Sequence, residues 1–286
     1  MADDARTYAA GVSLARAGGA VVMGTGIVSV ALSLDGRESL SRLLFVAAAA
    51  GLIAVAAALA TFAVSDRVTL REHACAPGAL TWVAATDVVG ARLTLFGWRH
   101  EAEALLVVAS ALWLVLVPCV LAHWRTPTVG LSFLLVVATE SVAVLTARVG
   151  FAHAALVPFA LGLAFYVFVV ARFDVRHVLE GDGDHWIAGG ALAIAALAAA
   201  RCGLHTLALA VWAAAAAWLP ALLLAEIVRP RLRFDPRRWS TVFPLGMYAV
   251  CSFAVGGRLV DFARAWVWVA LAAWATAAAG TVRRLA

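Results

Sequence analysis

The sequence predicts an all-α integral membrane protein, and two observations lead to this prediction. Of the 286 residues, 64% are hydrophobic and only 14% are charged, and the mean hydropathy is +0.95. Soluble domains are about 45–50% apolar and about 25% charged. Apolar runs of roughly 20 residues, the length that crosses a bilayer, follow one another with short polar breaks between them. Because lipid offers no partner to open backbone, we expect these runs to be helices.

Ten such spans fill almost the whole chain, so we expect a single transmembrane domain over 1–286. Charged and turn-forming residues separate the spans, as at Asp35-Gly36-Arg37-Glu38. The predicted spans lie near 14–34, 42–64, 77–96, 102–122, 128–147, 152–171, 184–202, 205–227, 240–257 and 264–282.

The arginines predict the topology. With ten spans both termini share one side of the bilayer, and 14 of the 22 basic residues, all of them Arg, fall on that side. The count includes Arg6, Arg16 and Arg233. Basic loops stay in the cytoplasm, which predicts cytoplasmic termini in the cell membrane. The net charge of +5 therefore indicates contact with lipid headgroups and not with nucleic acid.

The odd-numbered spans carry unusual residues, whereas the even-numbered spans are plain. Thr25, Thr86 and Thr139 recur at matching depth, and each has a small residue four positions later, on the same helix face. The other unusual residues are Gly24, Gly26, Ser29, Gly190, Pro244 and Gly246. This alternation predicts five helical hairpins with their odd helices around a central pore. Close helix packing through small residues is the alternative explanation.

Glycine and proline in these spans indicate what the pore carries. Pro244 removes a backbone hydrogen bond, and Gly24 and Gly26 weaken the first helix on both sides of Thr25. Helices broken inside the membrane expose amide groups that attract anions. We therefore expect an anion pathway lined by hydroxyl groups, glycines and free N–H groups.

Two carboxylates, Asp87 and Glu140, lie inside the third and fifth spans. Charged groups in the membrane are costly and usually face a cavity. They form either a proton-binding or gating pair, or structural contacts such as a hydrogen bond to a neighbouring helix or a salt bridge to Arg92 or Arg148. The sequence leaves these interpretations open.

We expect no cofactor, no metal site and no catalytic residues. Cys75, Cys119, Cys202 and Cys251 have no regular spacing and are interpreted as isolated small apolar residues, without metal or disulfide. An intramembrane enzyme is one alternative function, but the chain lacks Asp-rich loops and a HExxH motif. A non-transporting membrane scaffold is another, and it would not need glycine and proline in the odd spans.

Four segments resemble the tellurite-resistance/dicarboxylate transporter family, which includes plant slow-type anion channels, fungal malate permeases and sulfite efflux pumps. They are 21–29 (VVMGTGIVS), 136–145 (VVATESVAVL), 186–194 (WIAGGALAI) and 239–246 (WSTVFPLG). The resemblance implies transport of small anions or C4-dicarboxylates, in the malate, sulfite, tellurite or chloride/nitrate class. It also implies ten helices in five hairpins, often a homotrimer, and a pore blocked by a Phe on the ninth helix, here Phe243. A bulky apolar ring beside Pro244 would also close a narrow polar pore by excluding water. No residue identifies the anion or distinguishes a channel from a coupled carrier.

Overall fold

The computed structural model describes the backbone of residues 2–231 and 234–285 and the side chains of 17–231 and 234–284. Arg6, Arg16 and Arg233 of the topology prediction lie outside the described side chains. Within the described residues the chain is all helical, without a strand. The α-helices are α1 (Ala2–Leu34), α2 (Glu38–Ser65), α3 (Arg67–Ala74), α4 (Leu80–Leu95), α5 (Arg99–Ala122), α6 (Leu134–Arg148), α7 (Ala152–Val170), α8 (His177–Glu180), α9 (Ile187–Arg201), α10 (His205–Val228), α11 (Trp239–Val255) and α12 (Leu259–Leu285).

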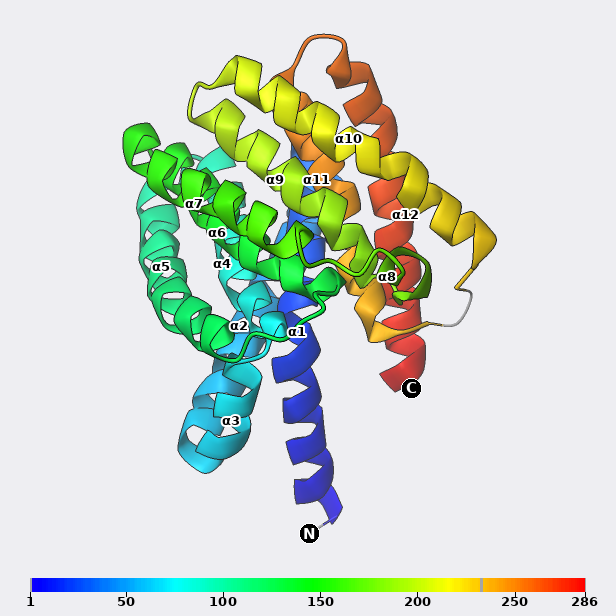
Figure 1. The fold of residues 1–286 in the computed structure, drawn as a ribbon. Coiled ribbons are helices and arrows are strands. Elements are labelled where there is room, and N and C mark those ends of the chain that lie inside the picture. Colours follow the sequence, from blue (N-terminus) through cyan, green and yellow to red (C-terminus); the bar gives the residue numbers. More distant parts are fainter. Residues whose placement is uncertain (1, 232–233, 286) are drawn as a thin grey trace.

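Long helices that follow one another in the chain pack together in pairs (Figure 1). The pairs are α1–α2, α4–α5, α6–α7, α9–α10 and α11–α12. The first members of these pairs also contact one another in a closed circuit, in the order α1, α4, α6, α9, α11 and back to α1. We call α1, α4, α6, α9 and α11 the inner helices, and α2, α5, α7, α10 and α12 the outer helices.

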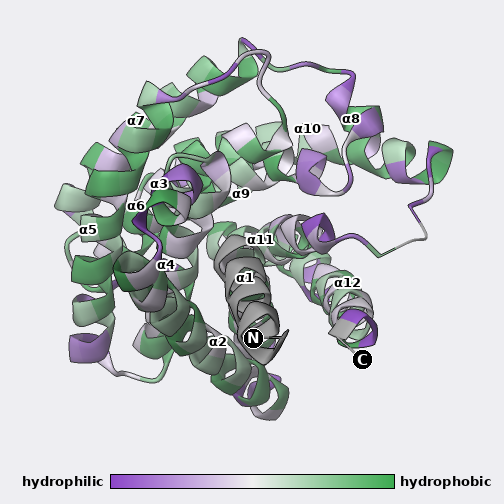
Figure 2. Ribbon diagram, turned by 90° about the horizontal axis from the view of Figure 1, so that it is seen from below, coloured by the Kyte–Doolittle hydropathy of each residue, from purple (hydrophilic) through white to green (hydrophobic). Residues whose placement is uncertain are grey.

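Burial separates the two sets. In the apolar windows of the inner helices α1 and α6, 78% of residues are buried, compared with 17–28% in the outer helices. The exposed surface of the outer helices is nevertheless hydrophobic, with side chains such as Ile53, Leu114 and Ile227 largely exposed. In Figure 2 hydrophilic residues gather mainly at helix ends and in connecting segments. An exposed apolar belt of this kind is suited to lipid.

A glycine with positive φ lies in the turn of each helix pair. These residues are Gly36, Gly97, Gly150, Gly203 and Gly256, with φ between 77° and 102°. Only glycine adopts this conformation without steric cost, and it commonly ends a helix at this position. The recurrence supports the repeat of helical pairs.

Short 3₁₀ turns precede four of the inner helices. Pro77–Ala79 leads into α4, Gly130–Phe133 into α6, Asp184–Trp186 into α9 and Pro236–Arg238 into α11. Together with these turns, the helical segments cover 77–95, 130–148, 184–201 and 236–255. At about 1.5 Å rise per residue each segment is roughly 27–30 Å long, close to the thickness of the hydrocarbon core.

Among the described residues, seven helices are long and apolar enough to cross a membrane: α1, α2, α5, α6 with its 3₁₀ turn, α7, α10 and α12. Helices also lie on the other predicted segments, at α4, α9 and α11, but they are shorter. The short helices α3 and α8 were not predicted, and α1 begins at Ala2 and not near residue 14.

The expected helix breaks do not occur. α1 continues through Gly24 and Gly26, and α11 continues through Pro244. Proline also lies inside the outer helices α5, α7 and α10. Interior proline therefore does not distinguish inner from outer helices in the described chain. Membrane helices tolerate it where neighbouring groups compensate for the lost backbone bond.

Candidate functional site

A small cavity lies between the inner helices, and all five of them contribute to its lining. Its volume is ≈ 20 Å³, which is room for about one water molecule. The apolar lining comes from Ile27, Val30, Val88, Ala91, Val144, Ile194, Leu197, Met247 and Val250. The polar lining residues are Asp87, Ser141 and Arg148. The axis enclosed by the inner helices is thus closed almost completely.

The polar residues of the cavity include groups without partners. Ser141 Oγ donates to Asp87 Oδ2 at 2.7 Å. Asp87 Oδ1 and the Nε and Nη2 groups of Arg148 are buried without a hydrogen-bond partner in the described part of the chain. Unpaired buried polar groups are rare because each costs roughly 1–3 kcal/mol or more. A cavity edged by free guanidinium N–H groups is therefore suited to an anionic or strongly hydrogen-bonding guest.

Asp87 and Glu140 have different surroundings. Asp87 on α4 lines the cavity, whereas Glu140 on α6 contacts α7, where its carboxylate lies directly against Gly162. Both Glu140 oxygens lack a hydrogen-bond partner among the residues described. The salt bridge to Arg92, one of the alternatives left open by the sequence, is not formed, because Arg92 Nη2 donates to Glu38 at 2.7 Å. The structure therefore does not bring the two carboxylates together as a pair on the axis.

Phe243 lies on the axial face of α11. Its side chain is fully buried, and Met247 and Val250, which line the cavity, follow it at i+4 and i+7. Residues at these spacings share one face of a helix. Phe243 therefore occupies the next layer toward the end of the molecule where both termini lie (Figure 1).

The predicted glycines are sites of close helix approach. A Cβ atom on Gly26 would lie 2.7 Å from Val88 of α4, and one on Gly246 would lie 2.6 Å from Ile27 of α1. A Cβ on Gly190 would lie 2.8 Å from the ring of Pro244, and one on Gly24 3.2 Å from Trp239. A side chain at any of these positions would crowd the neighbouring helix. Close packing, the alternative left open by the sequence, is therefore one role of these glycines.

The predicted hydroxyl groups bond to other parts of the helix bundle. Trp274 of α12 donates to Thr25 at 3.0 Å, and Trp113 of α5 donates to Thr139 at 2.9 Å. Ser29 exchanges hydrogen bonds with Ser41 of α2, and Thr86 donates to the carbonyl of Trp82 in its own helix. These side chains do not line the described cavity. Of the predicted site residues, Asp87 alone does.

No transport role was predicted for the arginines at the ends of inner helices. Arg92, Arg148 and Arg201 lie in the last turns of α4, α6 and α9, at the end of the bundle opposite the termini. Arg92 is buried against the ring of Phe96, with its guanidinium carbon 3.9 Å from the ring centroid. Each is preceded by Ala, at 91–92, 147–148 and 200–201, but the same dipeptide also occurs at 5–6, 15–16, 171–172 and 263–264, so the sequence alone does not single these three out.

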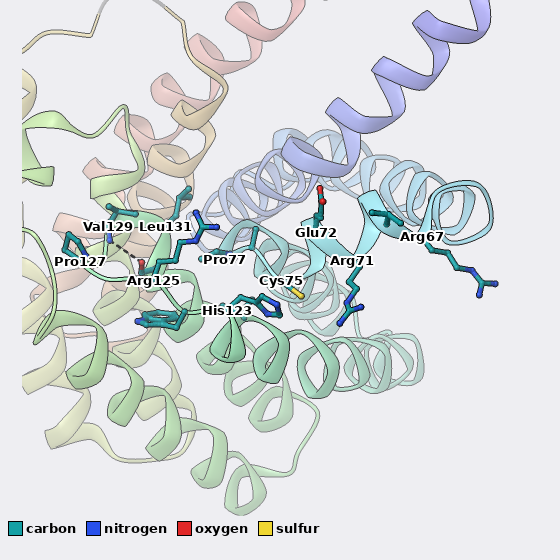
Figure 3. Close-up of a pocket in the computed structure, with 15 residues that line it drawn as sticks. Arg67, Arg71, Glu72, Cys75, Pro77, His123, Arg125, Pro127, Val129 and Leu131 are labelled. Carbon is teal, nitrogen blue, oxygen red and sulfur yellow. Dashed lines mark hydrogen bonds between the residues drawn. The ribbon is translucent and has the colours of Figure 1, made fainter.

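The interpretation of all four cysteines as isolated residues was wrong. Cys75 and Cys119 form a disulfide with a Cα–Cα distance of 4.9 Å, whereas Cys202 and Cys251 are free. The two paired cysteines are 44 positions apart. α3 turns back against the end of α5, and spacing along the chain does not reveal this contact. Cys75 borders a surface pocket of ≈ 910 Å³ (Figure 3).

Apolar outer helices around five inner helices that enclose a small, mostly apolar cavity define a helical membrane protein as the class of this molecule. The sequence model of the voltage-dependent anion channel family matches residues 17–282, so the chain belongs to this family. It is the tellurite-resistance/dicarboxylate transporter family, as the sequence motifs indicated. Membership implies anion transport across a membrane. A transport family is consistent with the prediction that the chain is not an enzyme. No curated protein matches the chain significantly.

Proposed function

We propose that the chain conducts small anions or C4-dicarboxylates along the axis between the inner helices. The observation that carries this proposal is the cavity lined by all five inner helices, with unpaired N–H groups of Arg148 at its edge. A cationic group inside low-dielectric walls concentrates anions. Arg92 and Arg201 add positive charge at the same end of the bundle.

The membrane arrangement in this proposal is ten spanning helices in five hairpins with cytoplasmic termini. Support comes from the pairwise helix contacts and from the 3₁₀ turns that lengthen α4, α9 and α11. Figure 1 places both chain ends at the same end of the molecule, as an even number of spans requires. A reporter fused to the C-terminus tests the topology. Activity of the reporter only outside the cytoplasm would contradict it.

In this proposal Phe243 is the gate. Its fully buried ring lies one helical turn from the cavity, on the same face of α11. A bulky apolar ring offers no hydrogen bonds to a hydrated ion, so it would resist conduction. Asp87, which hydrogen-bonds Ser141 at the cavity, is the better candidate for proton linkage. Glu140 is the weaker one because it faces α7.

Purified protein in liposomes tests the function. Flux of chloride, nitrate, malate and sulfite is measured with and without a pH gradient. Flux of at least one anion above that of protein-free liposomes supports the proposal, and dependence on the gradient indicates a proton-coupled carrier. Absence of flux for all four anions with correctly folded protein contradicts it. The homotrimer implied by the family resemblance is tested by cross-linking in native membranes.

A further inference from the structure

A cluster of metal-ligating side chains lies outside the transport axis, where α3 meets α5. Cys75 ends α3, Cys119 lies in the last turn of α5, and His123 directly follows α5. One ligand atom from each residue lies within 4.8 Å of the other two. A tetrahedral zinc site holds sulfur and nitrogen ligands roughly 3.5–3.8 Å apart. The side chains therefore need only small rotations to surround one ion.

The ring of His123 makes a hydrogen bond that fixes its tautomer. Its Nδ1 lies 2.9 Å from the carbonyl oxygen of Cys119, which can only accept, so Nδ1 carries the proton and donates. Nε2 then keeps its lone pair for a metal. Histidine ligands in metal sites usually donate their other ring N–H to a carbonyl or a carboxylate in this way.

The surroundings favour thiolate ligands and leave room for a fourth ligand. The pocket beside the cluster is lined by Arg67, Arg71 and Arg125, whose positive charges favour the thiolate form. In Figure 3 the His123 ring and the Cys75 sulfur lie side by side, whereas Glu72 points away from them. The fourth position is thus open to the pocket, as in zinc sites with three protein ligands and a water.

We propose that reduced Cys75, Cys119 and His123 bind a soft divalent cation such as Zn²⁺, with water as the fourth ligand. The two thiols release two protons on binding, and two thiolates balance the charge of the ion. The disulfide is the alternative state of the same sulfurs. A thiol or phosphine reductant supplies the two electrons that break its S–S bond, and two protons complete the thiols.

The proposed topology decides which state prevails in the cell. The cluster lies at the end of the molecule that holds both termini, the end expected in the cytoplasm. The cytoplasm keeps thiols reduced, so the metal-binding state is the ordinary one there. Bound metal would tie α3, which connects α2 to α4, to the outer helix α5.

Cobalt titration of the purified full chain tests this site. The protein is reduced with a phosphine, freed of the reductant under argon, and titrated with Co²⁺. We expect one equivalent to bind with the thiolate-to-cobalt charge-transfer band and the visible bands of tetrahedral Co²⁺, and Zn²⁺ to displace it. Thiol counting in denaturant should give two thiols for the oxidised protein and four for the reduced protein.

Matched variants identify the ligands. Cys75→Ser should abolish the charge-transfer spectrum of the site, and His123→Ala should weaken Co²⁺ binding at least tenfold. The control Cys202→Ser removes a free cysteine elsewhere and should change neither. Oxidised wild-type protein needs no substitution and should bind no Co²⁺. The proposal is overturned if reduced wild type takes up no cobalt, if the spectrum persists in Cys75→Ser, or if oxidised protein binds equally well.

Discussion

Truncation of Phe243 to alanine tests the proposed gate most directly. The ring is fully buried, and the cavity-lining Met247 lies four residues further along α11. Four residues correspond to about 6 Å along a helix. The ring therefore lies about one turn from the cavity, between it and the end of the bundle that holds the termini.

Removing the ring should join its space to the ≈ 20 Å³ cavity and admit water, which has a volume share of about 30 Å³ per molecule. We expect basal anion flux to rise at least tenfold, equivalent to a barrier lower by about 1.4 kcal/mol or more. Loss of a well-packed Phe costs about 3–5 kcal/mol in soluble cores. The melting temperature in detergent should therefore be measured together with the flux.

The assay is anion flux from proteoliposomes containing equal amounts of folded protein. Phe133→Ala is the matched control, since Phe133 is also fully buried but packs between Tyr166 and Phe173, away from the axis. A gate predicts faster flux for Phe243→Ala alone. Unchanged flux in a well-folded Phe243→Ala protein, or equal increases in both variants, would refute the reasoning.

Three further predictions use the same liposome and stability assays. Arg148→Gln should lower anion flux about tenfold or more because it removes the positive charge at the cavity, and unchanged flux would place the anion path elsewhere. Asp87→Asn should flatten the pH dependence of transport more than Glu140→Gln, since of these two carboxylates only Asp87 lines the cavity. A larger effect of Glu140→Gln would assign the proton-binding role to Glu140. Trp274→Phe should destabilise the protein by about 0.6–1.5 kcal/mol through loss of its bond to Thr25, and a double-mutant cycle with Thr25→Val should show coupling.

Sequence patterns predicted helix positions well because hydropathy reports burial in lipid directly. The division into small-residue helices and plain helices also corresponds to the inner and outer sets. The direction of individual side chains could not be predicted. The sequence predicted that Thr25 and Thr139 line a pore. In the structure their hydroxyl groups instead accept hydrogen bonds from tryptophans on outer helices.

The polar residues of the cavity were the hardest to identify. Ser141 and Arg148 lie about half a turn and two and a half turns beyond Thr139 in the same helix, and Arg148 looked like an ordinary span-end arginine. These residues stand out because polar atoms at the cavity have no hydrogen-bond partner within the described structure. Which atoms remain unpaired is determined by how the four other inner helices pack against α6, and the sequence does not show this packing. The disulfide is the same kind of case, because the approach of Cys75 to Cys119 depends on the turn between α2 and α3.

Tryptophans of the outer helices join neighbouring helix pairs in a regular way. Trp113 of α5 donates to α6, and Trp212 of α10 donates to Ser252 of α11 at 2.8 Å. Trp274 of α12 donates back to Thr25 of α1, 249 residues away, and so closes the circuit between the last pair and the first. Each bond runs from the outer helix of one pair to the inner helix of the next. A displacement of α11 at Phe243, the proposed gate, would therefore strain the hydrogen bond from Trp212 of α10 to Ser252 of α11. The outer helices would then take part in the gating motion.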